Sequence, residues 1–470
     1  MESTSNKVRS LFKHSLIYGI GLFLKKAIGL FLIPLYTHQF THFQYGKLAI
    51  LYLYSGALIL FFHLGLNDAF FKQFIEKKYN QREAYSRFFF FRLFYSSLFL
   101  ALFIIFSKNI AGILLDVGDI HLIQLATITI WIESLVTPSL LTLRIKNLSK
   151  IFVAVNTIRF ILNCTLNIIF VLYFKMGVGG VLIGNLLSGL VFFFLLYPLL
   201  HRNMIITFNW KPVKELLKYG LPLLPFSFIL LGLDLGDRWI IKWISGLGAT
   251  GLYTLGYQFG AVMGILVHGF RISWISFFFN NPEMKETFAD STIIFIRLSL
   301  ILWGILSLFT KEIFQLMVAE EYFSAISIVP IIAFSYIIFG LEEIFTAGFF
   351  IKSRTALLFP IVLLSFAANI VLNLLLIPYC GIIGAAISTL ISFLIFTSVS
   401  YFTAQKFFPV KYDFRTILTD LFIGIIFVCI PYIYHNHILL RIISFLSLCS
   451  IIIWKEKDRI KILIREYITH

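Results

Sequence analysis

Residues 15–36 read SLIYGIGLFLKKAIGLFLIPLY, and the rest of the chain is built around this stretch. An apolar run of about 20 residues, rising about 1.5 Å per residue, crosses the roughly 30 Å hydrocarbon core of a bilayer as a helix. Lys25 and Lys26 lie at the middle of the run. A charge at that depth costs at least about 3 kcal/mol, so we expect these lysines to face a water-filled cavity or an anionic partner.

The composition of the whole chain is that of a polytopic membrane protein. Of its 470 residues, 59% are hydrophobic and 13% are charged, whereas soluble domains are about 25% charged. The first apolar run is too long and too basic for a cleaved signal peptide, so we expect it to stay in the membrane. The four cysteines are scattered through apolar segments without metal-ligand spacing, and we interpret them as packing residues.

Fourteen apolar runs are candidate transmembrane helices, which predicts an all-α fold. They lie near 15–36, 48–66, 88–106, 121–143, 151–173, 178–200, 219–244, 251–275, 291–309, 324–350, 355–378, 381–402, 416–434 and 438–454. An even number of spans places both termini on one side. No connecting loop is long enough to fold as a catalytic domain.

The distribution of positive charge predicts the orientation. With a cytoplasmic amino terminus, the inside segments hold 26 of the 39 Lys and Arg, and the outside loops hold five. An excess of Lys and Arg in short loops marks the cytoplasmic face, so both termini are expected there. The net charge of +16 therefore follows from topology and does not indicate nucleic acid binding.

The two halves of the chain share a pattern of two asparagines four residues apart, followed after a short gap by two glycines three residues apart. The residues are Asn163, Asn167, Gly177 and Gly180 in the first half, and Asn369, Asn373, Gly381 and Gly384 in the second. Such a duplication predicts two pseudo-symmetric six-helix lobes related by an axis along the membrane normal. The expected boundaries are 1–200 and 201–404 for the lobes, and 405–470 for two appended helices with a basic tail.

Eight basic and five acidic residues within the predicted spans are considered as candidates for the site. The basic residues are Lys25, Lys26, Arg92, Arg159, Arg238, Arg271, Arg297 and Arg441, and the acids are Glu133, Asp234, Asp237, Glu342 and Glu343. The excess of positive charge favours an anionic ligand. Arg92 and Arg441 lie toward span ends, where their side chains can extend to the interface at low cost. We therefore predict a cationic substrate site formed by Lys25, Lys26, Arg159, Arg238, Arg271 and Arg297.

Helical spacing predicts which of these charges face inward. Asn156, Arg159, Asn163 and Asn167 fall at i, i+3, i+7 and i+11, on one face of a helix that lipid would reject. Asp234 and Arg238, four residues apart, can form an intrahelical pair.

The acids Glu133, Asp234, Asp237 and Glu342 are predicted either to bind a coupling proton or sodium ion or to pair with basic residues. Glu342 shares a helical face with Ser335 and Thr346, which favours it over Glu343 as the inward-facing acid. Asp237 and Arg238 are equally well explained as a structural pair. The sequence has no phosphate-binding loop, no zinc-protease motif and no nucleophile elbow. It therefore predicts no enzyme and no cofactor, and transport driven by a gradient.

Several motifs resemble the polysaccharide flippases of the multidrug, oligosaccharidyl-lipid and polysaccharide exporter superfamily. They are YGLPLLP at 219–225, DRWII at 237–241, GLYTLGYQFG at 251–260, ISWISFFF at 272–279 and NIVLNLLLIPYCGIIGAAISTL at 369–390, together with YGIGLFLKKAIGLFLIPLYT and QYGKLAILYL near the amino terminus. The resemblance implies two lobes around a cationic cavity that opens alternately to each side of the bacterial cytoplasmic membrane. Of the predicted site residues, it extends only to Lys25, Asp237 and Arg238.

The substrate implied by the resemblance is an undecaprenyl-diphosphate-linked oligosaccharide repeat unit, as used for O-antigen in lipopolysaccharide or for capsule. Expected partners are this lipid-linked glycan, membrane lipid and glycan-assembly proteins. A peptidoglycan-precursor flippase fits the same pattern, and a cation-coupled drug antiporter fits it less well, because a basic cavity repels cationic drugs. A membrane enzyme would need a large outside loop, and a scaffold protein would tolerate loss of Lys25, Lys26 and Arg159.

Overall fold

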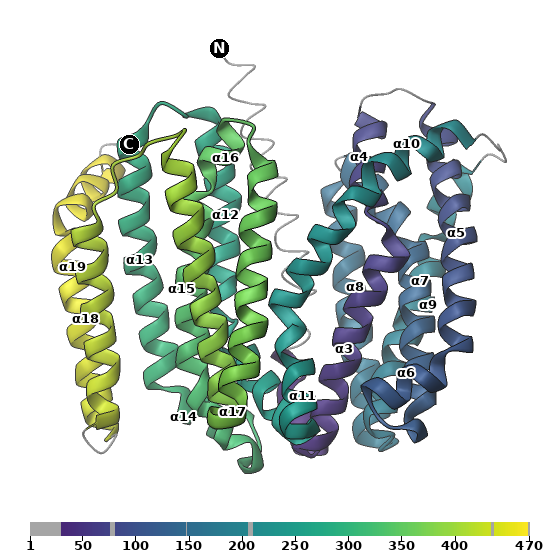
Figure 1. The fold of residues 1–470 in the computed structure, drawn as a ribbon, viewed down its shortest axis with the longest axis horizontal. Coiled ribbons are helices and arrows are strands. Elements are labelled where there is room, and N and C mark those ends of the chain that lie inside the picture. Colours follow the sequence, from purple (N-terminus) through teal and green to yellow (C-terminus); the bar gives the residue numbers. More distant parts are fainter. Residues whose placement is uncertain (1–29, 76–79, 147, 205–209, 434–436, 469–470) are drawn as a thin grey trace. The chain divides into compact units, whose positions relative to one another are not determined.

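A computed structural model describes most of the chain, and its described part is helical without any strand (Figure 1). The described ranges are 30–75, 80–146, 148–204, 210–433 and 437–468. Lys25 and Lys26 lie outside them, so their predicted place in a cationic site stays a prediction. The chain forms two compact units, Met1–Thr254 and Leu255–His470, which are considered separately.

Unit 1 contains the helices from α2 to α10 and most of α11. They are α2 (Ile33–Gln39), α3 (His42–His63), α4 (Leu66–Ile75), α5 (Gln81–Ile105), α6 (Ser107–Leu114), η1 (Val117–Asp119), α7 (Ile120–Ile145), α8 (Ser149–Asn167), the π-helical η2 (Ile168–Tyr173), α9 (Gly177–Asn203), α10 (Trp210–Gly220), η3 (Leu221–Leu223) and α11 (Leu224–Gly260). Helix α7 packs against α3, α5 and α9 and is the central element of this unit.

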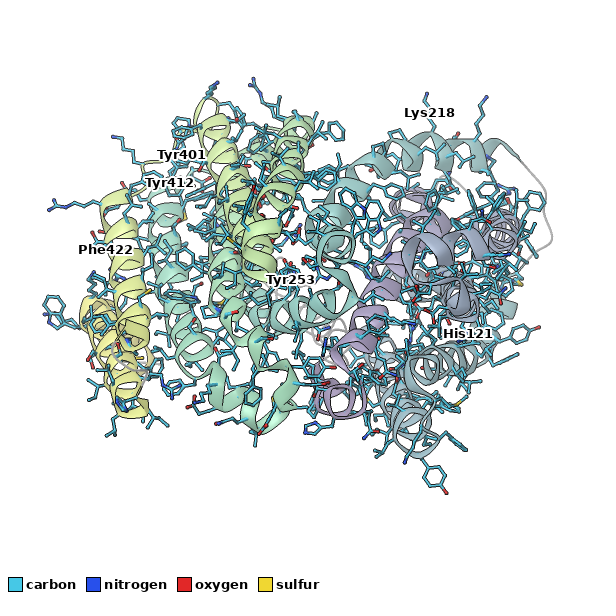
Figure 2. All side chains as sticks on the ribbon, turned by 60° about the horizontal axis from the view of Figure 1, so that its bottom comes forward. His121, Lys218, Tyr253, Tyr401, Tyr412 and Phe422 are labelled. Carbon is cyan, nitrogen blue, oxygen red and sulfur yellow. The ribbon has the colours of Figure 1, made fainter. Side chains whose placement is uncertain are left out.

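Unit 2 contains the end of α11 and the remaining helices. They are α12 (Met263–Asn280), α13 (Lys285–Leu308), α14 (Thr310–Met317), η4 (Glu320–Ile328), α15 (Val329–Phe345), α16 (Ala347–Ile351), η5 (Thr355–Leu357), α17 (Leu358–Gln405), α18 (Phe414–Ile433) and α19 (Ile438–Ile468). Here α15 packs against α12, α13 and α17, while α18 and α19 lie side by side against α13 (Figure 1). Tyr401 and Tyr412 lie near the end of α17 and just before α18, with ring centroids 6.1 Å apart (Figure 2).

The helices confirm a polytopic membrane fold. Within the described residues, 11 segments are long and apolar enough to cross a bilayer. Two of them, Pro212–Gly260 and Thr355–Gln405, have 49 and 51 residues, enough for two spans each. Each of these contains one non-helical residue, Gly246 or Gly381, between two predicted spans. The 11 segments therefore account for every predicted span except two. Most of span 15–36 lies outside the described residues, and span 251–275 overlaps one of these segments only as far as Gly260, since the rest of it lies mainly in α12.

The duplicated pattern has the same local geometry in both units. Asn167 Nδ2 donates to Asn163 Oδ1 over 3.1 Å, and Asn373 Nδ2 donates to Asn369 Oδ1 over 3.0 Å. The glycine that follows each pair has a left-handed backbone, with φ of 59° at Gly177 and 54° at Gly381. Few other residues adopt such a φ without strain, so the glycine allows the chain to turn between spans. The geometry fits a duplication, while the predicted lobe boundaries stay predictions.

Unit 1 extends beyond residue 200 because the following segment packs into its core. Leu216 on α10 is buried in one apolar cluster with Leu66 and Phe70 of α4 and Tyr85 of α5. The opposite face of α10 is polar, and Lys218 projects from it (Figure 2).

Helix α3 and α11 approach so closely that a side chain would not fit between them. A Cβ atom on Gly251 would lie 2.0 Å from the backbone oxygen of His42, and one on Gly46 would lie 1.9 Å from the backbone oxygen of Leu247. Backbone atoms cannot move aside as a flexible side chain can. Glycine at these positions is therefore required for the contact between the two helices.

We predict that Gly251→Ala destabilises the protein by about 2 kcal/mol or more, because overpacking against backbone forces the helices apart. Gly236→Ala is the matched control, since it lies on the same helix and its Cβ would have no neighbour within 4 Å. That control should be neutral or stabilise by up to about 1 kcal/mol, the difference in helix propensity between Gly and Ala. Thermal unfolding in detergent compares the two, and equal melting temperatures would contradict the close approach.

Candidate functional site

The polar stripe of α8 lies on the inner face of that helix. Asn156, Asn163 and Asn167 are buried, whereas Ile158 and Ile161, on the other side of the helix, are 47% and 57% exposed. This is the arrangement that the i, i+3, i+7, i+11 spacing predicts, because an apolar face is stable against lipid and a polar face is not.

Arg159, the one charge in the stripe, forms an ion pair with Glu133 on α7. The two side chains are 13% and 22% exposed, so neither is open to bulk water and neither is fully sealed. The Arg159 guanidinium also lies 5.1 Å from the ring centroid of Phe192 on α9, a cation–π contact. The structure thus brings together one predicted substrate-binding residue and one predicted charge-pair residue.

Pro138 in α7 explains the position of the buried Arg92, which bonds to the backbone of the residue after Glu133. Pro138 has no backbone N–H, so the carbonyl of Ser134, four residues earlier, loses its helical hydrogen bond. Arg92 Nη1 on α5 donates to that carbonyl over 3.4 Å, and its Nη2 donates to Asn67 Oδ1 over 2.7 Å. Arg92 is fully buried. Its place near a span end suggested that its side chain would extend to the interface, and it does not. Arg92 positions the helix that carries Glu133.

Next to Arg159, five side chains from four helices form what we call the amide–phenol ring: Tyr36, Tyr52, Asn163, Asn167 and Asn185. The Tyr36 hydroxyl donates to Asn167 Oδ1 over 2.9 Å, and Asn167 Nδ2 donates to Asn163 Oδ1. Asn163 Nδ2 donates to Asn185 Oδ1 over 2.8 Å. The Tyr52 side chain lies close to those of Asn185 and Tyr36 and completes the ring.

The predicted residues of α11 lie close together near its middle. Arg238 Nη1 donates to the backbone carbonyl of Asp234 over 2.5 Å, one helical turn earlier. The Asp237 carboxylate accepts a hydrogen bond from the Tyr253 hydroxyl over 2.7 Å, and the Arg238 guanidinium lies 5.7 Å from the centroid of the same ring. Tyr253 therefore links both residues of the DR motif.

In unit 2, Arg271 on α12 forms an ion pair with Glu343 on α15 over 2.8 Å. Arg271 is 44% exposed, whereas the neighbouring Glu342 is 5% exposed. Glu343 is thus the acid that pairs with the predicted substrate-binding arginine, and Glu342 points to the buried side of α15. Coupling through Glu342 stays a prediction.

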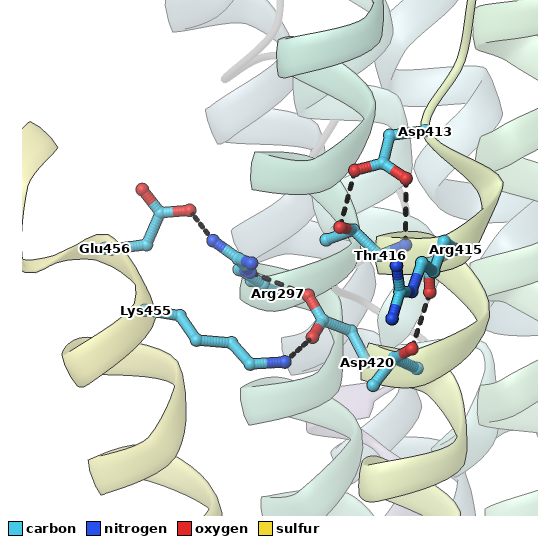
Figure 3. A network of polar contacts seen from close by, with 8 residues as sticks. Arg297, Asp413, Arg415, Thr416, Asp420, Lys455 and Glu456 are labelled. Atoms are coloured by element: carbon cyan, nitrogen blue, oxygen red, sulfur yellow. Dashed lines mark hydrogen bonds and ion pairs between the residues drawn. The ribbon is translucent and has the colours of Figure 1, made fainter.

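Arg297 has a different environment, which Figure 3 shows. Its guanidinium lies between Asp420 on α18, at 2.7 Å, and Glu456 on α19, and Lys455 of α19 also contacts Asp420. The Asp420 side chain is only 4% exposed. These contacts fix the two appended helices to α13, so we leave Arg297 out of the proposal below.

A second ion pair holds the other end of the appended helices. Arg441 on α19 donates through both terminal nitrogens to Glu312 on α14, over 2.8 and 2.6 Å, and also to the carbonyl of Leu308. Partial burial acts to raise the pKa of Glu312, but hydrogen bonds from Arg441 outweigh this effect and hold the pKa below its ordinary value. The described residues contain no group of three or more His, Cys, Asp or Glu suited to a metal ion.

Comparisons with known proteins agree with this architecture. Residues 41–269 match the model of a family described as polysaccharide biosynthesis protein. A structure titled lipid II flippase MurJ, inward closed conformation, matches with a TM-score of 0.79 at 15% identity, covering 95% of this chain and 100% of that one. No curated protein sequence matches.

Two structures of a multidrug resistance MATE family transporter of the MOP superfamily also match. The outward-facing one has a TM-score of 0.60 and covers 84% of this chain, and the inward-facing one has a TM-score of 0.63 and covers 81%; both are 14% identical and covered over 94% of their own length. The chain therefore shares the fold of these multi-pass membrane transporters. The match over residues 41–269, just under half of the chain, is to a polysaccharide biosynthesis family, as the resemblance of the sequence motifs predicts.

The effects of substituting Arg92 and Pro138 on stability should be coupled, because Arg92 bonds to the carbonyl that Pro138 leaves without its helical partner. Arg92→Met should lower the melting temperature, because losing bonds from a buried charged donor costs about 2 to 3 kcal/mol. In a Pro138→Ala background the new N–H can bond to the Ser134 carbonyl, so the same Arg92→Met change should cost about 1 kcal/mol less.

The control for this cycle is Arg87→Met. Arg87 lies on the same helix and pairs with Glu83 over 2.7 Å, away from Pro138. Its effect on the melting temperature should be the same in both backgrounds. If the effect of Arg92→Met on the melting temperature is also independent of Pro138, Arg92 does not compensate for the hydrogen bond that the Ser134 carbonyl loses.

Proposed function

We propose that this protein is a flippase that moves undecaprenyl-diphosphate-linked oligosaccharides across the bacterial cytoplasmic membrane by alternating access. The proposal includes cytoplasmic termini and glycan-assembly proteins as partners. The observation that carries it is the inward-facing stripe of α8, in which Arg159 is held between Glu133 and the Phe192 ring. The family match, which includes α8, supports a glycan rather than a drug as cargo.

A fixed arginine can compensate for the hydration that the diphosphate loses on entering the membrane. A diphosphate cannot enter hydrocarbon without losing its hydration, and a guanidinium replaces that hydration with paired, charge-assisted hydrogen bonds. The lipid tail stays in the bilayer while the headgroup moves through the protein. Arg159 lies on a helix that is otherwise apolar toward lipid, so its charge is available on the inner side alone.

The Glu133–Arg159 pair suggests how binding and coupling are linked. In the absence of substrate, Glu133 neutralises Arg159 and keeps the charge from being buried alone, which would be costly. An incoming diphosphate competes with Glu133 for the guanidinium. When the diphosphate takes the guanidinium, the partly buried Glu133 carboxylate loses this ion pair, which favours its protonation. Substrate binding is then accompanied by uptake of a proton.

A second candidate is a peptidoglycan-precursor flippase, which the TM-score of 0.79 to the lipid II flippase structure favours. At 15% identity that match establishes the fold alone. The two substrates share a polyprenyl diphosphate and differ in the sugars, so Arg159 would serve either one. Lys25, Lys26, Arg238 and Arg271 remain proposed contributors to the cationic site.

The experiment is translocation of a fluorescent undecaprenyl-diphosphate-linked oligosaccharide in proteoliposomes. Arg159→Gln should reduce the rate at least about 100-fold if the arginine holds the diphosphate, because losing a charged hydrogen-bonded pair costs about 3 kcal/mol. Glu133→Gln should retain substrate binding but make transport independent of the proton gradient. Arg441→Gln, which breaks an ion pair of α14 and α19 in unit 2, is the control and should keep a normal rate.

Wild-type rates with Arg159→Gln, in protein that is folded and inserted, would overturn the assignment. Complementation of two strains separates the cargo classes. A strain deficient in surface-glycan export should recover, and a strain lacking its peptidoglycan-precursor flippase should not. The reverse pattern would assign the protein to the second candidate.

A further inference from the structure

The amide–phenol ring lies directly beside the proposed headgroup site. Asn163 follows Arg159 by four residues on α8, which separates the two along the helix axis by about 6 Å. Helix α9 faces both, because Phe192 contacts Arg159 and Asn185 bonds to Asn163. In a lipid-linked glycan the first sugar is attached to the diphosphate. A diphosphate held by Arg159 would therefore place that sugar in one of two positions along α8. It would lie next to the ring, or one helical turn from Arg159 on the side away from the ring.

The members of the ring differ in how accessible they are. Asn167 is completely buried and Tyr36 is 4% exposed, so these two serve to join the helices. Tyr52 is 39% exposed, and Asn185 is half-buried. The ring thus has a closed inner side and an open side formed by Tyr52 and Asn185.

The chemistry of the open side suits a sugar. A carboxamide offers two N–H donors and an acceptor, and a phenol offers a hydroxyl and a flat apolar face. Neither group is charged, so neither competes with Arg159 for the diphosphate. The hydrogen bond from Asn163 holds the Asn185 carboxamide in place, which reduces the entropy lost when a ligand binds.

An unpaired hydroxyl lies on the same side of α9. Ser188 follows Asn185 by three residues and precedes Phe192 by four, which places all three on one helical face. Its side chain is fully buried, and its hydroxyl oxygen has no hydrogen-bond partner in the described part of the chain. Buried hydroxyls are nearly always bonded, so an unpaired one between these two residues is consistent with a ligand reaching this face.

We propose that Tyr52 and Asn185 bind the first sugar of the lipid-linked glycan and make this protein distinguish a glycosylated carrier from the bare carrier. The inference rests on the proposed function, because it places the diphosphate at Arg159. It adds a neutral carbohydrate subsite in unit 1, with Tyr52 and Asn185 as the residues that determine specificity.

The test measures equilibrium binding of two kinds of probe to the purified full-length protein. One is undecaprenyl diphosphate, and the other is the same lipid carrying, in turn, N-acetylglucosamine, N-acetylgalactosamine, glucose or galactose. Wild-type protein should bind at least one glycosylated probe more tightly than the bare lipid. Tyr52→Phe and Asn185→Ala should each reduce that preference about 5-fold, the effect of losing one hydrogen bond worth about 1 kcal/mol, and leave binding of the bare lipid unchanged.

The matched control is Tyr36→Phe, which removes a hydroxyl from the closed side of the ring. It should lower the melting temperature and keep the sugar preference. No preference in the wild type, or a preference unchanged by both Tyr52→Phe and Asn185→Ala, would overturn the subsite and leave the ring as a purely structural feature. Arg159→Gln tests the proposed function independently, because it should weaken binding of both kinds of probe equally.

Discussion

The structure depends on the need to pair polar side chains inside a protein that is surrounded by hydrocarbon. Helix α8 presents isoleucines outward and asparagines and Arg159 inward, and each of these inner groups bonds to a neighbouring helix or to its own helix. Lipid offers no hydrogen bonds, so such partners decide how the helices pack. The same pairing leaves a positive charge in the interior that an anionic substrate can use.

Two groups of polar contacts therefore serve different purposes. More deeply buried contacts between complementary charges, such as Arg297 with Asp420 at 10% and 4% exposure, join helices. The Glu133–Arg159 pair is more exposed, since 22% of the Glu133 side chain and 13% of the Arg159 side chain are accessible. Separating the charges of such a pair costs less free energy than separating those of a more deeply buried pair, because the exposed pair keeps part of its hydration. We therefore assign the Glu133–Arg159 pair to the proposed substrate site and the Arg297–Asp420 pair to the packing of helices.

The sequence predicted features that depend on local periodicity. Most of the spans and the inward face of α8 follow from residue spacing, and the structure contains them. It could not predict pairings between distant helices. Arg297 was assigned to the substrate site because Asp420, 123 residues away, was not recognised as its partner, although a lone aspartate within the predicted span 416–434 was a signal. Tyr36 and Tyr52 were missed because tyrosine is also common on apolar helix faces.

The central claim is that Arg159 exchanges Glu133 for a diphosphate, and equilibrium binding of undecaprenyl diphosphate to Glu133→Gln tests it most directly. Removing the competing carboxylate should tighten binding relative to the wild type by about tenfold, equivalent to about 1.4 kcal/mol, and should abolish proton uptake on binding. Unchanged affinity with unchanged proton uptake would contradict the exchange and with it the role of the pair in transport.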